Sequence, residues 1–127
     1  MEQILKKKIL IVDDDRTWLH LLKNILSKAG HDVIAAISGK EALLRVFSNS
    51  NEKEFDLLIT DLHMPQINGI ELIDRLKSAG VGIPIVVLSG SADGEMRTKL
   101  TQKGCLECLL KPINSKELVK KVNRILS

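Results

Sequence analysis

Carboxylates follow two apolar runs of this chain, directly where each run ends. Asp13, Asp14 and Asp15 follow the first run, and Asp61 follows a later one. Clustered carboxylates repel one another, so a fold that gathers them usually holds a cation that offsets their charge. Oxygen ligands of this kind suit Mg²⁺, which keeps several waters in its shell. We therefore expect a Mg²⁺ site with Asp14 and Asp61 as direct ligands and Asp13 acting through a bound water.

Two further apolar runs end in a hydroxyl and an ammonium, those of Ser89 and Lys111. With the carboxylates, these groups suit a phosphoryl group. A free oxygen of Asp61 can attack phosphorus, since carboxylates serve as phosphoryl acceptors. Phosphoryl transfer depends mostly on positioning and charge neutralisation, which Lys111 and a metal ion would supply. The Ser89 hydroxyl can then donate to a phosphoryl oxygen.

The elements that must position these side chains alternate between two kinds. Short apolar runs, each interpreted as a strand, span residues 9–12, 33–37, 57–60, 85–88 and 105–110. Most lack polar alternation, as expected for strands that helices cover on both faces. Between the runs, apolar residues recur at helical spacing and trace one apolar face for each expected helix. Two of these faces consist of Trp18, Leu19, Leu22, Ile25, Leu26 and Ala29, and of Ala42, Leu43, Val46 and Phe47. Such a βα repeat with right-handed crossovers predicts an α/β protein with a doubly wound, parallel five-stranded sheet of the flavodoxin-like kind.

The order of the strands decides whether the polar residues meet. Open parallel sheets bind ligands outside the carboxyl ends of their strands, where the strand order reverses. In the order 2-1-3-4-5, the first, third, fourth and fifth strands are neighbours, and their ends carry the polar set. The second strand, which contributes only Ser38, lies at the edge. The placement of the polar residues therefore favours this order.

The composition excludes several classes of protein. A chain of 127 residues, 44% hydrophobic and 28% charged, predicts one globular domain over residues 1–127. The formal charge of +3 is small, and the run Lys6, Lys7 and Lys8 is interpreted as the entry to a strand, because no aromatic residues are interleaved as in nucleic-acid sites. No apolar stretch approaches the roughly 20 residues that span a bilayer, and a signal-peptide pattern is absent. We expect a cytoplasmic protein without direct nucleic-acid or membrane binding.

Cys105 and Cys108 form a C-x-x-C spacing, which raises the question of redox or zinc chemistry. Redox pairs of this kind work at a helix N-terminus, where the thiolate is stabilised. A zinc site would need two further ligands nearby. On a strand, residues three apart point to opposite faces. We therefore expect two buried, unpaired thiols.

The predicted helix near residues 94–103 is the weakest of the set. Met96 and Leu100 give it a narrow apolar face, and Thr98 and Thr101 are mediocre helix formers. A low-stability element suits a conformational switch, and a short structural helix fits the pattern equally well.

In four stretches the sequence resembles the receiver domains of two-component response regulators. The stretches are residues 9–14, 58–65, 83–90 and 110–112, and the likeness extends over nearly the whole chain. The resemblance implies a single-domain, chemotaxis-type receiver, which is a signalling phosphoacceptor that assists its own phosphorylation and dephosphorylation rather than an enzyme. It also implies a sensor histidine kinase or a histidine phosphotransfer domain as the donor, and a downstream protein target or output domain.

The resemblance also assigns roles to single residues. It implies Asp61 as the phosphoacceptor, Asp13 and Asp14 as the acidic pair, Ser89 as the switch hydroxyl and Lys111 as the phosphate-binding lysine. It further implies Mg²⁺ coordination by the main-chain carbonyl of His63 and a cis peptide bond before Pro112. Cys108 stands where the family usually has Tyr or Phe, and Asn68 stands where many members have Asp. Output through the fourth helix is therefore expected to use another route than the family's coupled hydroxyl–aromatic switch.

Two alternatives come from other classes of protein. Residues 13–17 also fit the D-x-D-x-T opening of haloacid-dehalogenase-like phosphatases, with Asp13 as the nucleophile. That interpretation leaves Asp61 without a role, and Glu117 is the only acid after Lys111, where those enzymes need an acidic pair. A flavodoxin-like cofactor-binding module would need a phosphate-cradling loop in place of the aspartates.

Overall fold

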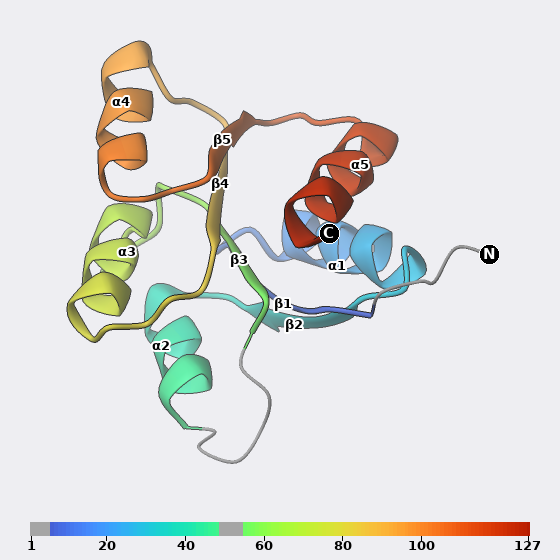
Figure 1. The fold of residues 1–127 in the computed structure, drawn as a ribbon, viewed down its shortest axis with the longest axis horizontal. Helices are drawn as coiled ribbons and strands as arrows, with labels where there is room; N and C mark the ends of the chain where they lie inside the picture. Colours follow the sequence, from blue (N-terminus) through green and yellow to red (C-terminus); the bar gives the residue numbers. More distant parts are fainter. Residues whose placement is uncertain (1–5, 49–54) are drawn as a thin grey trace.

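The computed structural model describes residues 6–48 and 55–127, in which strands and helices alternate (Figure 1). The bounds are β1 Lys8–Val12, α1 Arg16–Lys28, β2 Asp32–Ala36, α2 Gly39–Phe47, β3 Leu57–Thr60, α3 Gly69–Ser78, β4 Ile85–Ser89, α4 Gly94–Gln102, β5 Glu107–Leu110 and α5 Ser115–Leu126. Each strand lies within two residues of its predicted run. Residues 49–54, which the sequence indicates as a polar connection, lie outside the described residues. Among the described helices, each is too short or too polar to cross a bilayer.

The strands form one parallel sheet in the order β2-β1-β3-β4-β5, which confirms the predicted topology. β1 pairs with β2 on one side and with β3 on the other, so that Val12 lies opposite both Ala36 and Thr60. Helices α1 and α5 lie against one face of the sheet, and α2, α3 and α4 lie against the other (Figure 1). The fold is therefore doubly wound and flavodoxin-like. The strand order reverses at β1 and β3, whose carboxyl ends precede Asp13 and Asp61.

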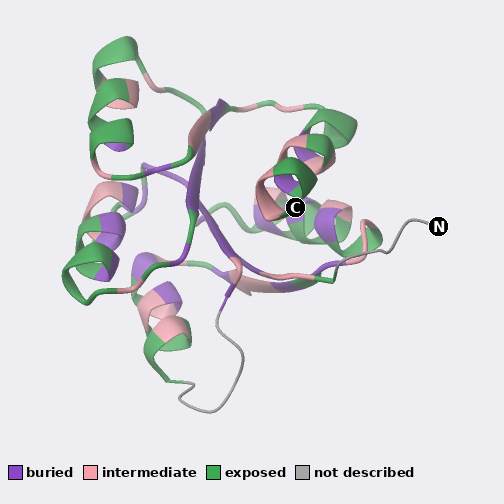
Figure 2. Cartoon of the chain, viewed as in Figure 1, coloured by how far each residue is buried: buried purple, intermediate pink, exposed green. Residues whose placement is uncertain are grey.

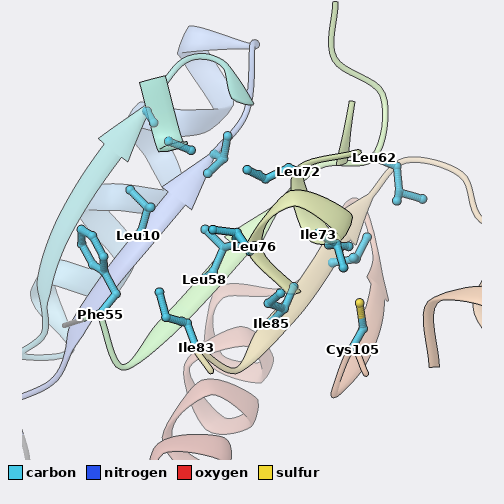
Figure 3. Close-up of a cluster of buried hydrophobic side chains, with 14 of the residues drawn as sticks. Leu10, Phe55, Leu58, Leu62, Leu72, Ile73, Leu76, Ile83, Ile85 and Cys105 are labelled. Atoms are coloured by element: carbon cyan, nitrogen blue, oxygen red, sulfur yellow. The ribbon is translucent and has the colours of Figure 1, made fainter. Parts of the chain in front are cut away.

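Alternate residues of the strands enter two separate cores. Ile9 and Ile11 of β1 pack with residues of α1 and α5, whereas Leu10 and Val12 pack with residues of α2 and α3. Figure 3 shows the second core, where Leu58 of β3 lies among side chains of α3 and β4. The sheet is accordingly buried throughout its centre, and the helices are exposed only on their outer faces (Figure 2).

Polar side chains begin every helix, because the first backbone N–H groups of a helix have no partner within it. The caps, each accepting a hydrogen bond from the first turn, are Asp15, Ser38, Asn68, Asp93 and Asn114. Asn68, which stands where the resemblance leads us to expect Asp, is therefore the cap of α3. Within α4, Leu100 alone is fully buried and Met96 packs partly against the core, as the sequence predicts.

Two side-chain predictions are wrong in part. Phe47, assigned to the buried stripe of α2, is the last residue of that helix and is 55% exposed. Cys105 and Cys108 are free thiols, as expected, but Cys108 is only half-buried. They do not face opposite sides of the sheet, since both pack against the same core. The reason is that Cys105 precedes β5, so the alternation of a strand does not apply across the pair.

Candidate functional site

The fold brings three of the predicted carboxylates together. One carboxylate oxygen from each of Asp13, Asp14 and Asp61 lies within 4.8 Å of the other two. Asp13 and Asp61 are buried, whereas Asp14 is exposed. Asp61 is distant from the other two in the sequence, and the parallel pairing of β1 with β3 brings it next to them in space. We refer to these three residues as the acidic triad.

Lys111 reaches the acidic triad from the end of β5. Its Nζ lies 2.6 Å from Asp13 Oδ2 and 3.7 Å from Asp61 Oδ2. The Lys111 amide also donates to the carbonyl of Ser89, which ties the end of β5 to the end of β4. The Lys111–Pro112 peptide bond is cis, as the resemblance implies.

Backbone amides fix the orientation of the two buried carboxylates. Asp61 Oδ1 accepts from the amide of Leu62 at 2.8 Å, and Asp13 Oδ1 accepts from the amide of Asp15 at 3.0 Å. The amide of Asp61 in turn donates to the Val12 carbonyl, which continues the β1–β3 ladder past the strand ends. In each residue one oxygen is held by the backbone, so the other oxygen faces Lys111.

Close backbone packing holds the segment after Asp61 in place. The amide of Gly69, the first residue of α3, donates to the Leu62 carbonyl at 2.8 Å. A Cβ at position 69 would lie 2.3 Å from the carbonyl oxygen of Asp61 and 2.9 Å from the Cα of Leu62. Only glycine leaves room for this approach, so Gly69 sets the distance between α3 and the phosphoacceptor candidate.

Ser89 and His63 lie in neighbouring turns. Ser89 is fully buried at the end of β4, where its hydroxyl donates to the Ser91 carbonyl at 3.2 Å. The side chain of His63 is exposed, and its Nε2 lies 3.5 Å from Ser91 Oγ. The Ser89 hydroxyl is therefore engaged within its own turn rather than with the carboxylates.

Sequence reasoning missed one residue at the site. Trp18, which the sequence assigns to the buried face of α1, is half-buried, and its ring lies beneath Lys111 with 5.3 Å between Nζ and the ring centroid. The only signal in the sequence is that Trp18 falls in the first turn after the aspartates, where a helix starts at the carboxyl end of β1.

The donor set of the acidic triad fits a divalent metal ion. Its ligands are hard carboxylate oxygens, which Mg²⁺ prefers. Among the described residues, the structure shows one ammonium, that of Lys111, paired with two of the three carboxylates. A net negative charge therefore remains at the triad, and a divalent cation would offset it.

A five-stranded flavodoxin-like sheet with an acidic triad and a lysine at its carboxyl edge defines the class, and comparisons with known proteins give the family. The model of the response regulator receiver domain matches residues 9–123. The two-component response regulator ARR11 of Arabidopsis thaliana is 34% identical over 113 residues, which are 87% of this chain and 21% of that protein. The transcriptional regulatory protein CpxR homolog of Haemophilus influenzae is 32% identical over 94% of this chain and 50% of that protein.

A solved structure of similar length agrees with these relatives. The chemotaxis protein CheY4 of Vibrio cholerae superposes with a TM-score of 0.86 at 28% identity, covering 96% of this chain and 100% of that one. The chain thus spans half or less of the two curated relatives but the whole of this structural neighbour. It belongs to the response regulator receiver domain family, and its acidic triad is typical of the receiver Mg²⁺ site.

Proposed function

We propose that the chain is a phosphoacceptor that takes a phosphoryl group onto Asp61 from a phosphohistidine and later releases it by hydrolysis. Membership of a two-component family implies a histidine kinase as the partner. A sensor kinase or a histidine phosphotransfer domain would serve as the immediate donor. The observation that carries the proposal is the acidic triad beneath the Lys111 ammonium at the carboxyl edge of the sheet. Receiver domains are generally cytoplasmic, which is the location we propose.

Each residue of the site has a task in this proposal. Asp13, Asp14, Asp61 and the main-chain carbonyl of His63 would hold Mg²⁺, which supplies charge neutralisation to the incoming phosphoryl group. The Oδ2 atom of Asp61 attacks phosphorus, while its Oδ1 stays on the Leu62 amide. Lys111 moves from Asp13 toward a phosphoryl oxygen. The donor histidine leaves with the electrons of its broken N–P bond.

The same geometry argues against Asp13 as the nucleophile. Both of its oxygens are engaged, one by the amide of Asp15 and the other by Lys111 at 2.6 Å. The Oδ2 atom of Asp61 has only the longer contact to Lys111, at 3.7 Å. The less strongly engaged oxygen is the better nucleophile, so the contacts favour Asp61 over the phosphatase alternative.

The signal would leave the site through Ser89 and the α4–β5–α5 surface. A phosphoryl oxygen on Asp61 competes with the Ser91 carbonyl for the Ser89 hydroxyl, so that the turn after β4 shifts. Arg97 of α4 donates to the Cys108 carbonyl of β5 at 3.1 Å, across the position where the family usually has an aromatic residue. Through this bond, a movement of α4 would also move β5. A downstream protein or output domain would then bind the altered surface.

The direct test is intact-mass spectrometry after incubation with a small acyl phosphate and Mg²⁺. We expect one added phosphoryl group on the wild type and none on Asp61→Asn. Asp15→Asn, which keeps a helix cap, is the matched control and should be labelled like the wild type. Labelling of Asp61→Asn to the wild-type extent, or steady hydrolysis of unrelated phosphate esters, would favour the phosphatase.

A further inference from the structure

Lys111 has a third neighbour that the proposed mechanism does not use. Besides Asp13 and Asp61, its ammonium faces the ring of Trp18, with Nζ 5.3 Å from the ring centroid. A cation within about 6 Å of an indole centroid is attracted by the ring's negative face. Trp18 is the only tryptophan of the chain. Substitution or labelling of tryptophan therefore changes this one residue alone.

Hydrogen bonds tie the position of Trp18 to the acidic triad. The Asp15 amide donates to Asp13 Oδ1, and Asp15 Oδ1 accepts from the Trp18 amide at 3.2 Å. Trp18 also packs against the core formed with α5. The indole is thus held between that core and Lys111, on the first turn of the helix that starts at the triad.

A metal ion at the triad would weaken the other contacts of Lys111. It would compete for the oxygens of Asp13 and Asp61, and its positive charge would repel the ammonium. The ring of Trp18 is neutral and cannot ligate Mg²⁺, so its attraction for the ammonium remains. The ring also leaves the N–H donors of Lys111 free to meet a phosphoryl oxygen.

Building on the proposed function, we propose that Trp18 is a positioning residue that holds the Lys111 ammonium beside Asp61 when the acidic triad binds its metal. The structural alternative is that Trp18 only fills space between α1 and α5. The two differ in one respect: only positioning depends on the electron density of the indole ring and on the charge of residue 111.

The first test uses the metal-free protein and measures unfolding in urea. In a double-mutant cycle of Trp18→Leu and Lys111→Met, we expect coupling of about two- to fivefold in the unfolding equilibrium constant. Trp18→Phe keeps an aromatic face, should retain part of the coupling, and replaces Trp18→Leu if that variant does not fold. Additive effects of the two substitutions would overturn the proposal.

The second test replaces Trp18 with a series of fluorinated tryptophans, which weaken the negative face of the ring with little change in size. We expect stepwise loss of stability with Lys111 present and a flat response in Lys111→Met. A flat response in both proteins would contradict the proposal.

The third test measures the rate of phosphorylation by a small acyl phosphate in Mg²⁺. Trp18→Leu should be about two- to fivefold slower than the wild type, with partial rescue in Trp18→Phe. Equal rates for Trp18→Leu and the wild type would overturn the positioning role. A wild type that accepts no phosphoryl group would instead refute the proposed function, and the metal-free tests would then decide whether Trp18 holds Lys111.

Discussion

At the scale of single residues, the site depends on which carboxylate oxygen each backbone amide holds. Asp13 and Asp61 each have one oxygen on an amide and one toward Lys111. The sequence predicts that Asp13, Asp61 and Lys111 meet, because each of them follows an apolar strand. The sequence does not predict which oxygen of each carboxylate accepts from a backbone amide and which one faces Lys111. That choice depends on the turns that follow Asp13 and Asp61. Sequence reasoning also missed the contact of Trp18 with Lys111, since helical spacing alone assigns Trp18 to the core.

The first prediction at this scale concerns metal binding. Asp13→Asn removes one negative charge from the acidic triad and should weaken Mg²⁺ binding about tenfold or more, as isothermal calorimetry can measure. Asp32→Asn removes the same charge from an exposed position at the start of β2 and is the matched control. Similar Mg²⁺ affinities for the two variants would count against the triad as the metal site.

At the scale of elements, a few close contacts place the helices around the site. The backbone of α3 packs closely against the segment after Asp61, and a side-chain hydrogen bond connects α4 to β5. The cap of α5 follows from the sequence, because Asn114 stands directly before the apolar periodicity of that helix begins. The tight approach of α3 to the segment after Asp61 does not, since nothing in the sequence distinguishes Gly69 from a glycine in an open turn. The tie between α4 and β5 also depends on tertiary placement.

The second prediction concerns Gly69. A methyl group here would collide with backbone atoms of Asp61 and Leu62, which cannot move independently of β3. Gly69→Ala should lower the free energy of unfolding by about 2 kcal/mol or more and reduce Mg²⁺ affinity. Gly82→Ala, where no atom lies within 4 Å of the new Cβ, is the control in urea unfolding. Equal stability of the two variants would show that the α3 approach is not tight.

The third prediction concerns the bond from Arg97 to the Cys108 carbonyl. Because α4 has only one fully buried residue, Leu100, we expect this bond to contribute to its attachment to β5. Arg97→Ala should destabilise the protein by about 0.5–1.5 kcal/mol and raise amide hydrogen exchange within α4. Lys99→Ala, at an exposed position of the same helix, should leave both unchanged. Unaltered exchange in Arg97→Ala would rule out this bond as the link between α4 and β5.

At the scale of the whole molecule, the strand order is what the sequence predicts best. The four strands that precede the site residues, β1, β3, β4 and β5, are consecutive neighbours in the sheet. The remaining strand, β2, lies at the edge next to β1. Core burial follows equally well for β1, β3 and β4, whose residues are apolar almost throughout. Burial is predicted wrongly or only in part at the ends of elements, where the helical or strand periodicity of side chains no longer applies. Phe47 at the end of α2 and Cys105 before β5 are the two examples.

The fourth prediction concerns stability at alkaline pH. Burial raises the pKa of the Cys105 thiol from 9.0 to about 11, and burial also raises the pKa of Cys108. Between pH 9 and 11 the unfolded chain loses the Cys105 proton while the folded protein keeps it, so the free energy of unfolding falls as the pH rises through this window. Urea unfolding of Cys105→Ala should show a shallower decline than the wild type. An identical decline would mean that other groups cause the alkaline loss.

The central claim, that Asp61 accepts the phosphoryl group, is tested most directly by locating the modified residue. Borohydride reduces an aspartyl phosphate to homoserine, which tandem mass spectrometry can place in the sequence after treatment with the acyl phosphate and Mg²⁺. We predict homoserine at position 61 and unmodified aspartate at positions 13, 14 and 15. Homoserine at position 13 with aspartate retained at 61 would contradict the account.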